Sequence, residues 1–286
     1  MLIPAYFLNA LLMILLPILL GIFLARKFHL SWRLFLFGGF AFILSQIFHL
    51  PLNALLAHFI PGLGAEGVVW LQALIFGFTA AMTEELARYS ILRNNLKEAR
   101  SWKAALMYGA GHGGFEAMIL GLLAGLTVVN MIALQNNPEA LNALPADKLA
   151  LVQQQMTAFW TTPWYLALMG AVERISTLII QISLAVIVMQ VFLKKNKSWL
   201  WAAIGWHWFV DAVAVLSAAR FSIPITELII GVLALTSLMI IFYFRPTPPE
   251  DESPPESEKP RDPIPLEALN FSPPTDKLDD SRYRSS

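Results

Sequence analysis

Residues 3–25, IPAYFLNALLMILLPILLGIFLA, form an uncharged apolar run that is long enough to cross a bilayer as a helix. No Lys or Arg precedes this run, and Arg26, Lys27 and Arg33 follow it. A signal peptide has the opposite arrangement, with basic residues before a short apolar region. We therefore expect a retained first transmembrane helix with its N-terminus on the outer side of the membrane.

The composition of the whole chain points to the same class of protein. The 286 residues are 57% hydrophobic and 14% charged, whereas soluble chains carry about 25% charged residues. Twenty basic residues balance twenty acidic ones, so the charge does not favour a nucleic-acid partner, and we expect none. The sequence holds no cysteine, which excludes disulfides, Cys-ligated zinc and thiol nucleophiles. The sequence predicts an all-α, polytopic transmembrane helix bundle surrounded by membrane lipid.

Charge clusters and prolines divide the chain into about seven spans, expected near residues 4–25, 34–57, 67–92, 104–134, 160–193, 198–219 and 223–244. Pro163 suits the first turn of the fifth span. Basic residues gather in alternate loops, around 26–33, 93–103 and 194–197, while the loops between them hold only Lys148 and Arg220. The positive-inside rule then gives an N-out, C-in orientation in a cell membrane.

The sequence predicts two parts, a transmembrane domain over 1–245 and a tail over 246–286. The tail is rich in proline and acidic residues and poor in apolar ones. Such a composition cannot bury enough apolar surface to offset chain entropy. We expect a disordered cytoplasmic tail that has a solvating role.

Ionisable residues inside spans are the best guide to function, because each costs on the order of 2.5 to 3.5 kcal/mol to insert. They fall in four short motifs: T-E-E-L-A-R at 83–88, G-H-G-G-F-E at 111–116, E-R-I-S at 173–176 and H-W-F-V-D at 207–211. His29, His49 and His58 lie near the expected ends of spans, where an interfacial place is the simplest interpretation. Function is therefore sought in the four motifs.

Three pairs in these motifs are four residues apart, which places both members on one helical face. The pairs are Glu84–Arg88, His112–Glu116 and His207–Asp211. Counted at about 1.5 Å per residue from the expected cytoplasmic ends, all three lie roughly 12 to 15 Å deep. We expect the three helices to meet in a polar pocket below the cytoplasmic surface.

Two imidazoles and two carboxylates are a plausible ligand set for a zinc-type divalent ion, with a further carboxylate to activate water. The predicted ligands are His112, Glu116, His207 and Asp211. Ordinary structural roles stay open: Glu85 and Arg88 can form a self-neutralising ion pair, and His112 can be a core residue among closely packed glycines. His207, between two tryptophans, can serve aromatic packing. Adjacent Glu173 and Arg174 lie about 30 Å from the expected cytoplasmic end of their span and do not match the other depths.

In order and spacing, the four motifs over roughly residues 1 to 245 resemble the YhfC family of intramembrane metalloproteases. That family is similar to the CAAX protease and bacteriocin-processing (CPBP) superfamily and to the PrsW-like proteases. The resemblance implies that Glu84 activates water and that Glu85 and Arg88 support it, although spacing alone does not say which Glu is the base. It implies that His112 and His207 bind the metal or polarise the carbonyl. Asp211 stands where the related pattern usually has Asn, and a carboxylate there favours metal ligation.

The expected function is an intramembrane metal-dependent endopeptidase that hydrolyses a peptide bond in or near a membrane segment of a substrate. The cofactor expected from the resemblance is a divalent ion, with zinc favoured, and the resemblance favours a bacterial plasma membrane. A proton- or ion-coupled transporter also places Glu, His, Arg and Asp within spans. A non-catalytic membrane scaffold or immunity protein is the third alternative.

Overall fold

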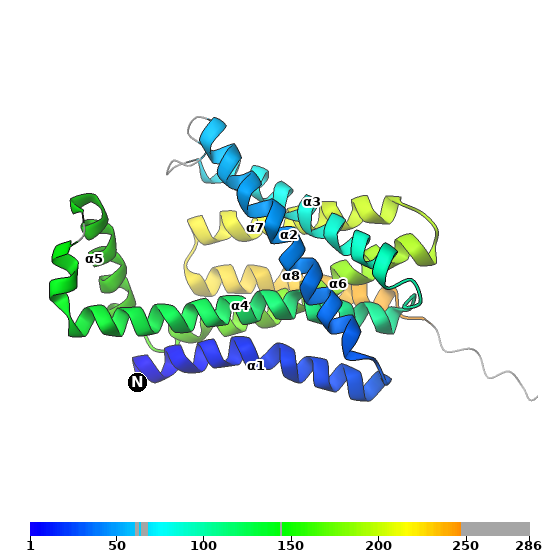
Figure 1. The fold of residues 1–286 in the computed structure, drawn as a ribbon, viewed down its shortest axis with the longest axis horizontal. Coiled ribbons are helices and arrows are strands. Elements are labelled where there is room, and N and C mark those ends of the chain that lie inside the picture. The colour runs from blue at the N-terminus through cyan, green and yellow to red at the C-terminus, as the bar shows by residue number, and fades with distance from the viewer. Residues whose placement is uncertain (61–62, 64–67, 144, 247–286) are drawn as a thin grey trace, which may run out of the picture. The chain divides into compact units, whose positions relative to one another are not determined.

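The computed structural model describes residues 1–60, 63, 68–143 and 145–246, and over these residues the chain is helical, with no β-strand (Figure 1). The fold-class prediction is confirmed. Of the predicted tail, residues 247–286 lie outside the described residues. The helices are α1 (Leu2–Phe28), α2 (Trp32–Phe59), α3 (Val69–Asn95), α4 (Trp102–Asn136), η1 (Pro138–Ala143), α5 (Ala146–Thr161), η2 (Leu166–Leu168), α6 (Met169–Leu193), α7 (Ser198–Arg220) and α8 (Ile223–Tyr243).

Six helical segments of the described chain are long and apolar enough to cross a membrane: α1, α2, α4, η2 with α6, α7 and α8. The chain is an integral multi-pass membrane protein. The remaining expected span, 67–92, corresponds to α3, which has 27 residues. Its polar and charged residues, Glu84, Glu85 and Arg88 among them, lower its apolarity below that of the other six. The orientation across the membrane stays a prediction.

The fifth expected span, 160–193, is wrong at its start. Residues up to Thr161 belong to α5, which the sequence analysis placed in a loop, and α6 begins only at Met169. The break follows from Pro163, because a residue that precedes proline is pushed out of the helical region. Thr162 has φ −63° and ψ 129°, which is extended backbone. Pro163 therefore separates two helices instead of starting one.

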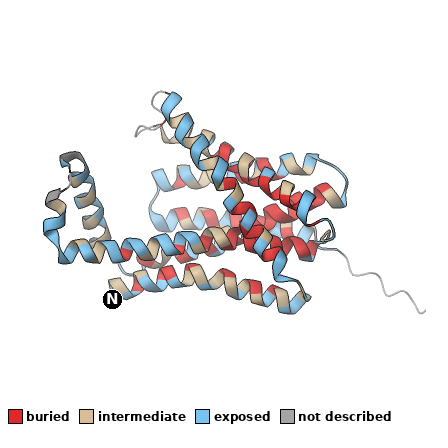
Figure 2. Ribbon diagram, viewed as in Figure 1, coloured by how far each residue is buried: buried red, intermediate tan, exposed pale blue. Residues whose placement is uncertain are grey.

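Helix α6 is the centre of the bundle. Every residue from Ile180 to Val191 is buried, and α6 packs against α4, α7 and α8 (Figure 2). Helix α4 joins it to α1 and α2, and α3 packs between α2 and α7. A polar side chain on the middle of α6 therefore faces protein from several helices, which matters for Gln181.

Glycines let α2 and α4 cross almost backbone to backbone. A Cβ atom added at Gly111 would lie 2.0 Å from the carbonyl oxygen of Phe35, and one at Gly38 would lie 2.0 Å from that of Tyr108. Gly109 packs against α6 in the same way, since a Cβ atom added there would lie 2.7 Å from the Cα of Ile182. These glycines serve close helix packing, as small residues do in membrane bundles. The crossing fixes the place of His112, the next residue after Gly111.

Candidate active site

Helix α3 presents two adjacent carboxylates that have different surroundings. Glu85 and Arg88 are fully buried, and the Arg88 Nε donates to the Glu85 Oε2 over 3.0 Å. Arg88 also donates to the backbone oxygen and the side-chain Oε1 of Gln181, over 3.2 and 2.6 Å. The ion pair of this helix is thus Glu85–Arg88, at a spacing of three, and Glu84 is left for other partners.

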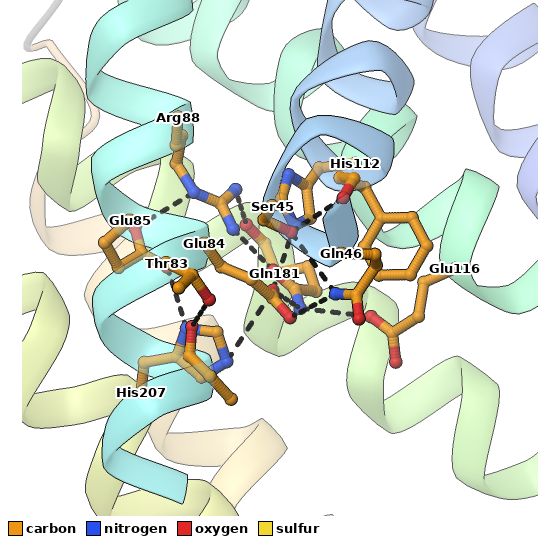
Figure 3. A network of polar contacts seen from close by, with 12 residues as sticks. Ser45, Gln46, Thr83, Glu84, Glu85, Arg88, His112, Glu116, Gln181 and His207 are labelled. Atoms are coloured by element: carbon orange, nitrogen blue, oxygen red, sulfur yellow. Dashed lines mark hydrogen bonds and ion pairs between the residues drawn. The ribbon is translucent and has the colours of Figure 1, made fainter. Parts of the chain in front are cut away.

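Side chains from α2, α4, α6 and α7 surround the Glu84 carboxylate of α3 (Figure 3). Its Oε2 lies 3.0 Å from the His112 Nε2 of α4, 3.4 Å from the Gln181 Nε2 of α6 and 3.8 Å from the His207 Nε2 of α7. Its Oε1 accepts from the Gln46 Nε2 of α2 over 3.3 Å. The side chain is 9% exposed, whereas that of Glu85 is 0% exposed. Glu84 alone of the two faces open space.

His207 lies between the two glutamates and Asp211. Its Nδ1 is 2.8 Å from the Glu85 Oε1, and its Nε2 is 3.5 Å from the Asp211 Oδ2. The Glu85 carboxylate can only accept, so the Nδ1 carries a proton and donates it. This leaves the His207 Nε2 facing Glu84 and Asp211, whose side chain is 32% exposed. An imidazole held at Nδ1 by a carboxylate is oriented for proton transfer at Nε2.

His112 is a buried residue whose ring packs edge-on against Phe42, with the two ring centroids 5.5 Å apart. Its Nε2 is the atom that meets Glu84, while its Nδ1 has no hydrogen-bond partner among the described residues. A hydrogen bond to the carboxylate requires the proton on Nε2. His112 therefore holds Glu84 from the α4 side.

Glu116 contacts Arg174 and Gln181 instead of the two imidazoles. It accepts from the Arg174 Nη1 over 2.6 Å and from the Gln181 Nε2 over 3.1 Å. Arg174 also pairs with Glu173. The E-R-I-S motif lies in the first turns of α6, where Arg174 reaches Glu116 of α4. Arg174 thus pairs with two carboxylates, which accounts for the position of Glu116.

A cavity of about 540 Å³ opens onto these groups. Its polar wall includes Glu84, Glu116, Gln181, His207 and Asp211, and its apolar wall is formed mostly by side chains of α2 and α4, with Ala80 of α3. The apolar residues are Phe42, Ile43, Leu50, Ala80, Ile119, Leu120 and Leu123. Most of these, including Ile43, Leu50 and Leu123, are well exposed at the lipid-facing surface of the bundle. The cavity thus joins a polar cluster to an apolar wall.

Gln181 and Gln46 are members of the site that the sequence analysis missed. Gln181 links Arg88, Glu84 and Glu116, and Gln46 contacts Glu84 from α2. His49, which was expected at the membrane interface, also lines the cavity. Neutral amides cost less than charges within a span, so they do not stand out in the sequence. The available signal for Gln46 was its spacing of three from His49, which places both on one face of α2.

The structure separates one of the four predicted metal ligands, Glu116, from His112, His207 and Asp211. His112 and His207 flank Glu84, but Glu116 is engaged by Arg174 and Gln181. In the described part of the chain, the Glu84 carboxylate contacts the two imidazoles directly, and these three groups are not arranged around an ion. Imidazoles and carboxylates are suitable donors for zinc, yet the direct contacts of His112 and His207 with Glu84 leave no closed ligand shell around an ion among the described residues.

Comparison with known proteins places this geometry in a family. A family model described as "YhfC intramembrane metalloprotease" matches residues 12–233. The "Uncharacterized membrane protein YhfC" of Bacillus subtilis (strain 168) is 29% identical over 218 residues, which are 71% of this chain and 80% of that protein. No solved structure matches the chain. The family description implies a peptidase that uses a metal ion. Because the family model spans most of the helical part, the chain belongs to the YhfC intramembrane metalloprotease family.

Proposed function

We propose that the chain hydrolyses peptide bonds within the membrane, with Glu84 as the general base. The observation that carries the proposal is the Glu84 carboxylate, held 3.0 Å from the His112 Nε2 and facing a cavity of about 540 Å³. A general base must be within hydrogen-bond reach of the water it deprotonates. Of the two adjacent glutamates, only Glu84 faces the cavity, since Glu85 is fully buried between Arg88 and His207.

The remaining groups divide the other tasks of amide hydrolysis. Water attacks the carbonyl carbon as Glu84 takes its proton, and the leaving nitrogen must then receive a proton. His207 is suited to this second transfer, because its Nε2 lies 3.8 Å from the Glu84 Oε2 while Glu85 holds its Nδ1. The Nε2 can accept the proton that Glu84 took from water and pass it to the leaving nitrogen. His112 holds the base, and Arg88 compensates the charge of Glu85. Asp211 borders the cavity beside His207.

The walls of the cavity support an apolar, membrane-associated peptide as the substrate. Ile43 and Leu50 of α2 face the same space as Leu120 and Leu123 of α4, and all four are exposed on the bundle. In a bilayer such side chains contact lipid or an apolar segment of another chain. A substrate segment lying there would place its backbone beside Glu84. The metal ion implied by the family description, and zinc in particular, stays a prediction for this site.

The test is cleavage of a single-span reporter peptide by the purified protein in lipid vesicles. Glu84→Gln should abolish cleavage, because an amide cannot take the proton from water. Glu227→Gln is the matched control, since it removes a carboxylate from a span outside the cavity. Equal cleavage by Glu84→Gln and the parent would refute the proposal. A pH-sensitive dye in the same vesicles tests the transporter alternative, which requires proton or ion flux without cleavage.

A further inference from the structure

Three polar side chains form a connected row on α2, a largely apolar helix. Gln46, His49 and Asn53 are spaced by three and four residues and so share one helical face. The residues between them, such as Ile47 and Phe48, are exposed and apolar. Polar groups in a span are costly unless they are satisfied. Here each of the three is hydrogen-bonded to the next.

The row begins and ends on α3. The Thr79 Oγ1 lies 2.6 Å from the Asn53 Oδ1, and the Asn53 Nδ2 lies 2.8 Å from the His49 Nε2. The His49 Nδ1 lies 3.3 Å from the Gln46 Oε1, and the Gln46 Nε2 lies 3.3 Å from the Glu84 Oε1. Four hydrogen bonds therefore connect Thr79 to Glu84 through α2.

The Glu84 carboxylate sets the direction of all four hydrogen bonds in this series. Glu84 only accepts, so the Gln46 amide must donate to it, and a second contact agrees. The Gln46 Nε2 also donates to the Ser45 Oγ over 3.2 Å, and the Ser45 hydroxyl is itself committed to the Phe42 carbonyl (Figure 3). The amide orientation is thereby fixed, and the Gln46 oxygen must face His49 as an acceptor.

The tautomer of His49 follows from that acceptor. Its Nδ1 must carry the proton that it donates to Gln46, and in a neutral ring its Nε2 then accepts from Asn53. Asn53 donates through its nitrogen, so its oxygen accepts from the Thr79 hydroxyl, whose contact with Asn53 over 2.6 Å is shorter than its contact with the Phe76 carbonyl over 3.0 Å. All four bonds donate toward Glu84. Aligned hydrogen bonds polarise one another, which strengthens the last donor of the series.

We propose that His49 is a positioning residue for Glu84, locked as the neutral Nδ1–H tautomer between Asn53 and Gln46. The series of hydrogen bonds fixes the Glu84 Oε1 from the α2 side. The Oε2, beside His112 and His207, is left for the reacting water. This proposal rests on the role of Glu84 as the base. A purely structural role in joining α2 to α3 would not require one tautomer of His49 or one direction of the hydrogen bonds.

The first test is the ¹⁵N NMR spectrum of histidine-labelled protein in lipid nanodiscs, which needs no activity. The His49 signal is the one that His49→Gln removes, and it should show a protonated Nδ1 and a bare Nε2. Asn53→Asp reverses the link, because a carboxylate can only accept, so the Nδ1–H tautomer should be lost. A bare Nδ1 in the parent, or an unchanged spectrum in Asn53→Asp, would overturn the proposal.

The second test is kinetic and changes Thr79, the residue of the hydrogen-bond series farthest from Glu84. Thr79 does not line the cavity, so Thr79→Val should lower kcat roughly two- to tenfold with KM unchanged, and Thr79→Ser should restore it. Thr83→Val is the matched control, since that hydroxyl bonds only carbonyls of its own helix and should have no effect. An equal kcat in Thr79→Val and the parent would contradict positioning. A parent without proteolysis would instead refute the proposed function, and the NMR spectrum would still decide the tautomer.

Discussion

The crossing of α2 and α4 gives a quantitative prediction for Gly111→Ala. The added methyl carbon would lie 2.0 Å from the Phe35 carbonyl oxygen and 2.6 Å from both the carbonyl carbon and the Cα of Phe35, where ordinary contact begins at 3.4 Å. All three are backbone atoms, so no side chain can rotate away, and the two helices must separate by more than about 1 Å. Overpacking of this kind costs about 1 to 3 kcal/mol. The separation also moves His112, which follows directly in the sequence, away from Glu84.

Thermal unfolding in detergent, followed by tryptophan fluorescence, measures this cost. For a unit of this size the expected loss corresponds to a Tm lower by roughly 3 to 10 °C. Gly205→Ala and Gly231→Ala are matched controls, because nothing lies within 4 Å of the added carbon at either site. Alanine is the better helix former by about 1 kcal/mol, so the controls should melt at the same temperature or higher. A Gly111→Ala variant as stable as the controls would refute the close crossing.

Two further predictions concern the charges of the site. Arg88→Gln leaves the buried Glu85 without its cation, so it should lower the free energy of unfolding by about 3 to 5 kcal/mol. Adding Glu85→Gln should recover much of that loss in thermal unfolding. An Arg88→Gln variant as stable as the parent would contradict the ion pair. A metal chelator should leave the Tm of the purified protein unchanged, because Glu84 contacts His112 and His207 directly and these contacts hold their helices together without an ion. A Tm lowered by the chelator would show that an ion stabilises the fold.

Much of the fold follows from the sequence because apolar length and basic loops are strong constraints in a membrane. The start of α6 does not follow from the sequence, because Pro163 is compatible both with the first turn of a helix and with a break between helices. The extended backbone of Thr162 settles the matter in favour of a break. The crossing of α2 and α4 is also hidden, because glycines show where helices can approach but not which helices do.

The site is predictable where burial of charge is costly. Glu84, His112 and His207 stand out as ionisable residues in spans, and the structure brings them together. Gln181 and His49 do not stand out, because an amide is cheaper to bury and a histidine near a span end has a simpler interpretation. Glu116 has a suitable spacing for a ligand, yet tertiary packing gives it Arg174 as a partner. Spacing defines a helical face, and packing decides what that face meets.

Hydrolysis in water enriched in ¹⁸O tests the central claim most directly. The parent, in vesicles with the single-span reporter, should release a fragment whose new terminal carboxyl group carries one ¹⁸O atom, because the attacking oxygen comes from water. Glu84→Gln should release no fragment, while Glu227→Gln should match the parent. The account is contradicted if the parent releases no fragment, or if Glu84→Gln releases the labelled fragment at the rate of the parent.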